Sequence, residues 1–123
     1  MIILDTNILI EILKGNEATI KTVQTFNERL LISSITVMEL YYGAINKAEI
    51  KKLERFLSLF QVEHLNENIS LKSILLIKTY AKSHNLDIPD SLIAATAIVS
   101  ECKVFTYNLK DFRYIDDLEL IHI

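Results

Sequence analysis

Short apolar runs alternate along this chain with longer segments in which apolar residues recur at helical spacing. A short apolar run bounded by polar residues is typical of a buried strand, and recurrence every three or four residues is typical of a helix. We predict strands at 2–4, 30–32, 62–65, 104–106 and 120–121. We predict helices over 8–13, 36–44, 49–60, 67–83 and 91–99.

Three of the predicted helices differ in character. In 49–60 the apolar residues share one face, which is typical of an amphipathic surface helix. Segment 67–83 carries Leu71, Ile74, Leu75 and Lys78 at helical spacing. Residues 91–99 are small or apolar on all sides, so we expect a helix packed inside the domain, with Pro89 at its first position.

The predicted strands are apolar without a period of two, which indicates a parallel sheet covered on both faces. The fold class is therefore α/β, in three layers. A length of 123 residues fits one domain, 1–123. With half the residues apolar and only two Gly and one Pro, the composition excludes a disordered or low-complexity chain.

Charge and cysteine content narrow the setting. Thirteen basic and 16 acidic side chains give a net charge of −3, which argues against a protein that only coats nucleic acid electrostatically. The single Cys102 cannot form an internal disulfide, so we expect a reducing, cytoplasmic setting. No apolar stretch is long enough to cross a bilayer, and the N-terminus lacks a signal-peptide pattern, so we expect no membrane association.

Of four candidate acids, Asp5, Asp90 and Asp111 stand near predicted strand ends or helix starts, where open parallel sheets bind ligands, and Glu39 lies one turn into its predicted helix. Each has an ordinary structural explanation when taken alone. Asp5 is a good helix N-cap, and Thr36 with Glu39 matches a capping box. The helix dipole favours Asp90 in a first turn, and Asp111 is an ordinary polar loop residue. The functional signal is therefore collective.

Carboxylates that converge on one edge of a sheet repel one another unless a cation compensates them. All-oxygen ligands suit Mg²⁺ or Mn²⁺, and the spacing of His64, His84 and His122 provides no zinc-type pair. Without a phosphate-binding glycine loop, the acids favour hydrolysis of a phosphodiester by an activated water over a nucleoside triphosphate site. We then expect products with a 5′-phosphate and a 3′-hydroxyl.

Four motifs occur together over essentially the whole chain. They are Leu4-Asp5-Thr6-Asn7, residues 32–40 followed by Tyr42-Gly43, residues 89–95 (Pro-Asp-Ser-Leu-Ile-Ala-Ala), and residues 106–112 (Thr-Tyr-Asn-Leu-Lys-Asp-Phe). Each motif is weak alone, but the set resembles the PIN-domain family and, within it, the VapC-type toxin ribonucleases of type II toxin–antitoxin systems.

The resemblance implies an α/β/α sandwich around a parallel sheet and a Mg²⁺-dependent endoribonuclease, with Mn²⁺ as a possible substitute. It further implies a homodimer, an RNA substrate and a small antitoxin partner whose segment blocks the active site. The implied acidic quartet, which would bind the metal and carry catalysis, is Asp5, Glu39, Asp90 and Asp111, with Asp5 and Asp90 as direct metal ligands. The implied supporting residues are Thr6, Asn7, Thr106 and Asn108.

RNA contacts require local rather than total charge, because the chain is acidic overall. Candidate cations are Lys14, Lys47, Lys51, Lys52, Arg55, Lys110 and Arg113, although a charge run such as 51–55 also fits a solvated helix face. Candidate stacking residues for unpaired bases are Tyr41, Tyr42 and Tyr107, with core packing as the alternative for the first two.

Two alternative functions are weighed against the nuclease. A receiver-like phosphoacceptor domain would need a second acid after Asp5 and a Lys at a late strand end, where Thr6 and Tyr107 stand. A catalytically inactive PIN-fold binding module would share the fold and differ in measured cleavage.

Overall fold

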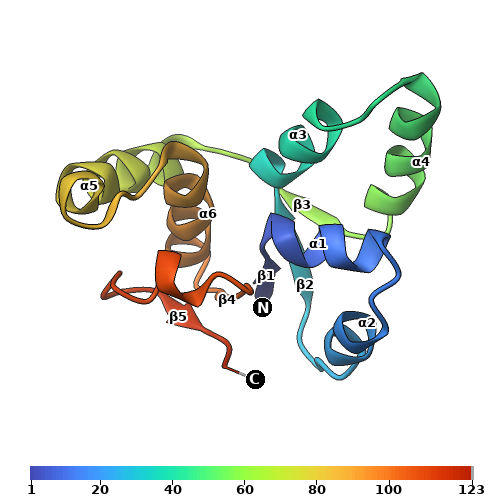
Figure 1. Cartoon of the computed structure of the whole chain (residues 1–123). Helices are drawn as coiled ribbons and strands as arrows, with labels where there is room; N and C mark the ends of the chain where they lie inside the picture. The colour runs from blue at the N-terminus through green and yellow to red at the C-terminus, as the bar shows by residue number, and fades with distance from the viewer. Residues whose placement is uncertain (123) are drawn as a thin grey trace.

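Five short parallel strands form the centre of the molecule. The computed structural model describes residues 1–122. The strands are β1 (Ile2–Leu4), β2 (Leu30–Ser33), β3 (Gln61–Glu63), β4 (Lys103–Phe105) and β5 (Glu119–Leu120), in the sheet order β3-β2-β1-β4-β5 (Figure 1). Ile3 of the central strand lies opposite Leu31 on one side and Val104 on the other. The predicted parallel sheet is confirmed.

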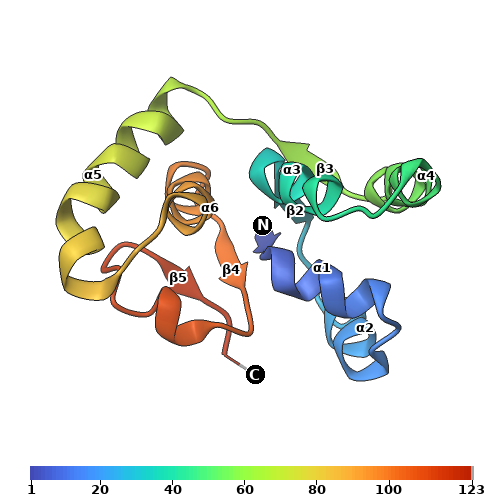
Figure 2. The ribbon, with the colours of Figure 1, turned by 45° about the horizontal axis from the view of Figure 1, so that its top comes forward.

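Helices cover both faces of this sheet, as Figures 1 and 2 show. The helices are α1 (Thr6–Leu13), α2 (Glu17–Gln24), α3 (Ser34–Tyr42), α4 (Lys47–Leu57), α5 (Glu67–His84) and α6 (Ile88–Val99), with a 3₁₀ turn, η1, at Leu109–Asp111. In both views α5 and α6 lie together on one side of the sheet, and α1 to α4 lie on the other. The three-layer α/β/α architecture predicted from the sequence is therefore present.

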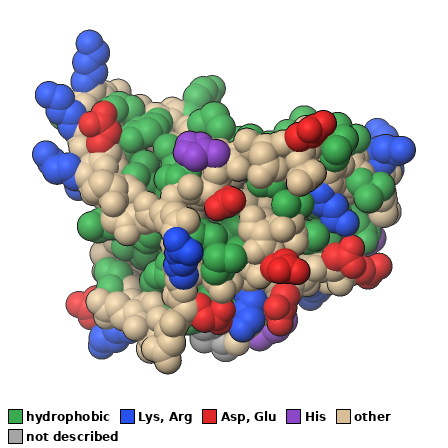
Figure 3. Space-filling view, turned by 180° about the vertical axis from the view of Figure 1, so that it is seen from behind, with side chains coloured by type: hydrophobic (Ala, Val, Ile, Leu, Met, Phe, Trp, Pro, Cys, Tyr) green, Lys and Arg blue, Asp and Glu red, His purple; other side chains and the backbone are tan. Residues whose placement is uncertain are grey.

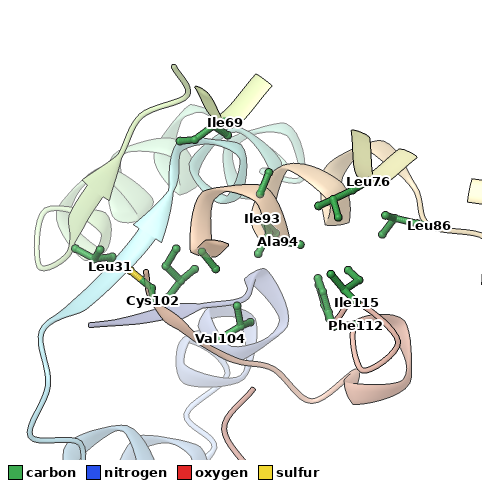
Figure 4. Close-up of a cluster of buried hydrophobic side chains, with 13 residues drawn as sticks. Leu31, Ile69, Leu76, Leu86, Ile93, Ala94, Cys102, Val104, Phe112 and Ile115 are labelled. Carbon is green, nitrogen blue, oxygen red and sulfur yellow. The ribbon is translucent and has the colours of Figure 1, made fainter. Parts of the chain in front are cut away.

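Successive strand residues point to opposite layers, which gives the molecule two hydrophobic cores. Ile3 and Val104 belong to the core under α5 and α6, where Phe112 also packs (Figure 4). Ile2 and Phe105 belong to the core under the remaining helices. Because β1 and β2 contribute apolar residues to both cores, their sequences are largely apolar rather than alternating. The helix predicted to be central, α6, is buried along most of its length.

The sequence patterns missed α2 and displaced several helix ends. Thr19 is the one fully buried residue of α2, and its apolar residues Ile20 and Val23 are only partly buried, so this short helix gives a weak sequence signal. The helix α3 begins at Ser34 rather than near Thr36, because the Ser33 side chain accepts a hydrogen bond from the Ile35 N–H and caps it. The capping-box explanation for Glu39 is therefore wrong. Pro89 occupies the second helical position of α6, one later than predicted.

The surface has two notable properties. The apolar residues predicted on α5 face outward: Leu71, Ile74 and Leu75 are each more than half exposed, while Ile69, Ser73 and Leu76 form the buried side. On the face seen in Figure 3, acidic and basic side chains are interspersed with apolar ones. Within residues 1–122, no helix combines the length and apolar character needed to span a membrane.

Candidate active site

Asp5 lies at the carboxyl end of the central strand and caps α1. Its Oδ1 accepts a hydrogen bond from the Thr6 N–H at 2.8 Å, and the side chain is only 5% exposed. Burial raises the pKa of Asp5 above 3.8; hydrogen bonds from Thr106 and Thr6 lower it in part, and the charges of Glu39 and Asp111 raise it further. The predicted N-cap role is thus confirmed, and it leaves the other carboxylate oxygen for a second contact.

Thr106 makes that second contact from the neighbouring strand end. Because Leu4 is in register with Phe105, the residues that follow β1 and β4 lie side by side. The Thr106 hydroxyl donates to Asp5 Oδ2 at 2.7 Å and accepts from the Asn108 N–H at 3.0 Å and from Asn7 Nδ2 at 3.3 Å. With two donors directed at its oxygen, the hydroxyl proton is directed to Asp5. Hydrogen bonding of this kind favours the ionised carboxylate.

Glu39 reaches the same region from the first turns of α3. The Thr6 hydroxyl lies 2.8 Å from Glu39 Oε1, to which it donates, and 2.9 Å from the Thr36 hydroxyl. An ionised carboxylate can only accept, so Thr6 gives its single proton to Glu39 and accepts the proton of Thr36. Thr36 is fully buried, whereas Glu39 is exposed. Two threonines therefore fix the position of an otherwise solvent-facing carboxylate.

Asp90 lies in the first turn of α6, in the helical layer on the other side of the sheet from Glu39 and α3. Its backbone N–H donates to Asp87 Oδ1 at 2.8 Å, because Asp87 caps this helix. The pKa of Asp90 rises from 3.8 to about 7: burial is the largest cause, followed by the charges of Asp87, Asp5, Asp111 and Glu39. Each of the other three predicted acids therefore acts on Asp90.

Asp111 ends the 3₁₀ turn η1 and lines a small pocket together with Asp87 and Asp90. The pocket has a volume of about 90 Å³ and is otherwise lined by 84–86 and Tyr114. Burial raises the pKa of Tyr114 above 10.0, with Asp90, Asp111 and Asp87 adding to the effect. The fourth acid therefore shares a pocket with the third, on the side of the site away from Glu39.

The four acids thus come from four elements and meet in one electrostatic neighbourhood at the carboxyl edge of the sheet. Within residues 1–122, none of Asp5, Glu39, Asp90 and Asp111 forms an ion pair with Lys, Arg or His. In the same part of the chain, no group of three or more His, Cys, Asp and Glu side chains is arranged as a ready metal cage. The arrangement is a set of separated carboxylates, not a preformed chelate.

The donor set nevertheless fits a hard divalent cation. The candidate ligands are carboxylate oxygens, and the side chains that hydrogen-bond to Asp5 and Glu39 are threonine hydroxyls. Burial raises the pKa values of Asp5 and Asp90 most, and the charges of neighbouring acids raise both further. Mg²⁺ usually takes only one or two protein carboxylates directly and keeps several waters, so separated acids are compatible with it. The residues present therefore suit Mg²⁺ or Mn²⁺ better than zinc.

Several residues near the acids were assigned little in the sequence. Asp87 was not singled out, although its position three residues before Asp90 matches an N-cap. His84, interpreted as a surface or packing residue, stacks on Tyr114 with ring centroids 4.2 Å apart, and both line the pocket of Asp90 and Asp111. These contacts depend on tertiary packing of the α5–α6 connection against the loop after η1, and no short sequence motif reports such packing.

The proposed RNA-contact residues have mixed surroundings. Tyr107 is half exposed, and its hydroxyl hydrogen-bonds to Thr19 of α2. Tyr41 packs against the core under α1 to α4, as predicted by the alternative that gives it a packing role. Tyr42 is 94% exposed. The lysine candidates include two that line a groove beside Glu39.

That groove lies between α1, α3 and α4 and has a volume of about 590 Å³. Its lining includes the apolar residues Ile10, Leu13, Leu40 and Leu53, together with Glu39, Lys14 and Lys52. Because Glu39 belongs both to the groove and to the acidic site, anything bound along the groove reaches the edge of that site.

Known proteins share this sequence and architecture. The family model for the PIN domain matches residues 2–118. Ribonuclease VapC19 of Mycobacterium tuberculosis is 32% identical over 123 residues, covering 97% of this chain and 98% of that protein. Ribonuclease VapC10 of the same organism is 31% identical over 122 residues, covering 97% and 91%.

A solved structure agrees with these sequence relatives. The VapBC2 complex of Rickettsia felis, bound to a DNA fragment from its promoter, contains a chain with a TM-score of 0.83 and 29% identity, covering 98% of both chains. The family match extends over nearly the whole chain, and the fold agrees over the same span. This chain therefore belongs to the PIN-domain family.

Proposed function

We propose that this chain is the toxin ribonuclease of a toxin–antitoxin pair and hydrolyses RNA phosphodiesters with Mg²⁺ at Asp5, Glu39, Asp90 and Asp111. The observation that carries the proposal is the convergence of four carboxylates: Thr6, next to Asp5, donates to Glu39, and Asp90 and Asp111 line one pocket. In the described part of the chain, none of the four is paired with a cationic side chain. The relatives named ribonuclease support the reaction class.

Asp5 and Asp90 are the proposed direct ligands, with Glu39 and Asp111 acting directly or through water. A divalent ion held there supplies a water of lowered pKa and offsets negative charge that develops on the phosphate. Asp5 is suited to this role because two hydrogen bonds hold its carboxylate in a fixed orientation. Asp90 is suited because it is ionised less readily than an exposed carboxyl, and a cation restores the ionised form.

The hydroxyl groups of the site have defined directions in this mechanism. The Thr106 hydroxyl donates its hydrogen bond to Asp5, so this carboxylate remains a hydrogen-bond acceptor. Thr6 does the same for Glu39 while Thr36 holds Thr6 in place. Neither carboxylate has to reorganise before an RNA phosphate arrives, which is the advantage of a preorganised polar site.

We further propose that the groove beside Glu39 receives a segment of the antitoxin. The groove combines apolar side chains with two lysines, Lys14 and Lys52, and two glutamates, Glu39 and Glu49, so it suits an extended or helical segment that carries apolar side chains and charges of both signs. A solved toxin–antitoxin complex from Klebsiella pneumoniae, which contains a chain 28% identical to this one, supports such a partner. Ala48 also lines the groove, and Ala48→Trp is expected to prevent neutralisation by the cognate antitoxin without removing RNA cleavage.

A homodimer through α5 completes the proposed assembly. The outward row of Leu71, Ile74 and Leu75 is an apolar surface on one helix face. In a dimer with two-fold symmetry, the same surface of each subunit packs against the other. One row of apolar residues on each chain is therefore covered by the same row of its partner.

The test is cleavage of total cellular RNA by the purified chain with Mg²⁺, with Mn²⁺ and with EDTA. We expect products with a 5′-phosphate and a 3′-hydroxyl that depend on the added ion and are absent with Asp5→Ala. Asp116→Asn, which alters an exposed acid, serves as the matched control. Cleavage that persists in EDTA or in Asp5→Ala would overturn the proposed mechanism.

The alternatives are separated by the same experiment. A folded chain that binds its antitoxin and cleaves no RNA would be the inactive binding module. The receiver-like alternative has lost its support, because the chain belongs to the PIN-domain family.

A further inference from the structure

Asp87 is a fifth carboxylate beside the proposed ion site, outside the quartet. It is exposed and caps α6, where its Oδ1 accepts the Asp90 N–H at 2.8 Å. This hydrogen bond attaches the Asp87 carboxylate directly to the backbone of a proposed metal ligand. The position of Asp87 relative to Asp90 is therefore fixed by the first turn of the helix.

Asp87 also lines the small pocket that Asp90 and Asp111 share. One wall of this pocket is the stacked pair of His84 and Tyr114, whose ring planes differ by 14°. At about 30 Å³ for each water in the liquid, the volume of about 90 Å³ has room for about three waters. A carboxylate here can act on a hydrated ion through solvent without being a direct ligand.

The charge of Asp87 lies close to two of the four acids. Its carboxylate accepts the Asp90 N–H and lines the same pocket as Asp90 and Asp111. Within residues 1–122, Asp87 has no cationic side chain in ion-pair contact. Its charge is therefore not cancelled locally.

We propose that Asp87 is a positioning residue for the divalent ion, which orients Asp90 through the helix cap and strengthens ion binding by its charge across the shared pocket. This inference rests on the proposed function, because it concerns the same ion. The competing explanation is that Asp87 only caps α6, as aspartate does at many helix starts.

The two explanations separate because capping and charge can be removed independently. Asp87→Asn retains an N-cap side chain and removes the charge, Asp87→Ser does the same with a shorter cap, and Asp87→Ala removes both. The measurement is the Mg²⁺ dissociation constant of each purified variant by isothermal titration calorimetry, with the melting temperature in EDTA as the measure of capping. Asp116→Asn is the control for loss of an exposed aspartate elsewhere.

We expect Asp87→Asn and Asp87→Ser to weaken Mg²⁺ binding about three- to tenfold, as a unit charge several ångströms from a divalent ion does in a water-rich site. The Mg²⁺ concentration that gives half-maximal RNA cleavage should rise by a similar factor. Asp87→Ala should weaken binding at least as much and also lower the melting temperature in EDTA.

Two contrary results have different meanings. Mg²⁺ binding that is equal in Asp87→Asn and in the unaltered chain would overturn this inference and leave the proposed function intact. Absence of Mg²⁺ binding in the unaltered chain would overturn the proposed function and this inference together.

Discussion

Replacing Asp90 with asparagine should stabilise the metal-free chain above pH 7. The pKa of Asp90 is about 7 in the folded protein and close to 3.8 when unfolded. Between these values the folded state holds a proton that the unfolded state has released, so stability falls as the pH rises. The stability that the folded state gains from this proton is fully present below about pH 4 and is lost as the pH rises through about 7.

The magnitude follows from the same two pKa values. At about 1.4 kcal/mol for each pH unit between them, the upper limit is about 4 kcal/mol. Asp90 is only partly buried, so solvent screening reduces this to about 1–2 kcal/mol. Asp90→Asn is therefore expected to raise the melting temperature in EDTA at pH 8 by about 3–8 °C, with the gain disappearing near pH 4.

Adding Mg²⁺ should reverse the order of the two proteins. Ligand at 100 times its dissociation constant stabilises a folded state by about 2.7 kcal/mol, and Asp90→Asn should lose most of this gain. Thermal unfolding from pH 4 to pH 8, with EDTA and then with Mg²⁺, measures both effects, and Asp116→Asn is the control. A variant less stable than the unaltered chain in EDTA at pH 8 would refute the reasoning, because Asp90 would then not carry an unfavourable charge.

Two further substitutions test other parts of the account. Thr106→Val removes the hydroxyl that donates to Asp5 and leaves the Asn108 N–H without that acceptor. It should destabilise the chain by about 1–3 kcal/mol, measured by denaturant unfolding, and weaken Mg²⁺ binding, measured by calorimetry. An unchanged Mg²⁺ affinity would show that Thr106 does not act on Asp5. Leu75→Lys should convert the proposed dimer to monomer and lower the melting temperature, because Leu75 is half exposed in the single chain and is covered in the proposed dimer. A dimer that persists in sedimentation velocity would exclude α5 as the interface.

The strands and the buried helix were predictable because their signals are local. The central strand β1 is a short apolar run, since Ile2 and Ile3 face opposite cores and neither position tolerates a polar residue. The edge strands β3 and β5 each hold one apolar residue, and their bounds differ from the predicted ones. The burial of α6 follows from the small residues that let it pack closely on α5. Both features can be read from neighbouring residues without knowledge of the rest of the chain.

Elements without such a local signal were missed. The helix α2 buries only Thr19 completely and is stabilised by its Asn16 cap and by contacts that its sequence does not announce. The outward row on α5 has the same spacing as a buried face, so periodicity identified the helix and could not say which side was exposed. Only the packed fold distinguishes Leu75 from Leu76.

The acidic site shows the same division. The motifs singled out Asp5, Glu39, Asp90 and Asp111, and the fold brings the other three close enough for their charges to act on Asp90. The direction of the Thr106 proton and the contribution of Asp87 could not be predicted, because both depend on atoms from elements distant in the sequence. An ordinary structural role of a single acid is compatible with function. The N-cap of Asp5, for example, uses only one of its two carboxylate oxygens.

The proposed mechanism requires one divalent ion that is shared by acids from four separate elements. Titration of the ¹⁵N-labelled chain with substoichiometric Mn²⁺, followed by paramagnetic broadening of backbone amide signals, tests this sharing directly. We expect the amides of Thr6, Ser91 and Phe112 to broaden together and first, and Asp5→Asn to remove the effect at all three. Broadening confined to one of these segments, or centred on Asp116 and Asp117, would contradict a shared site.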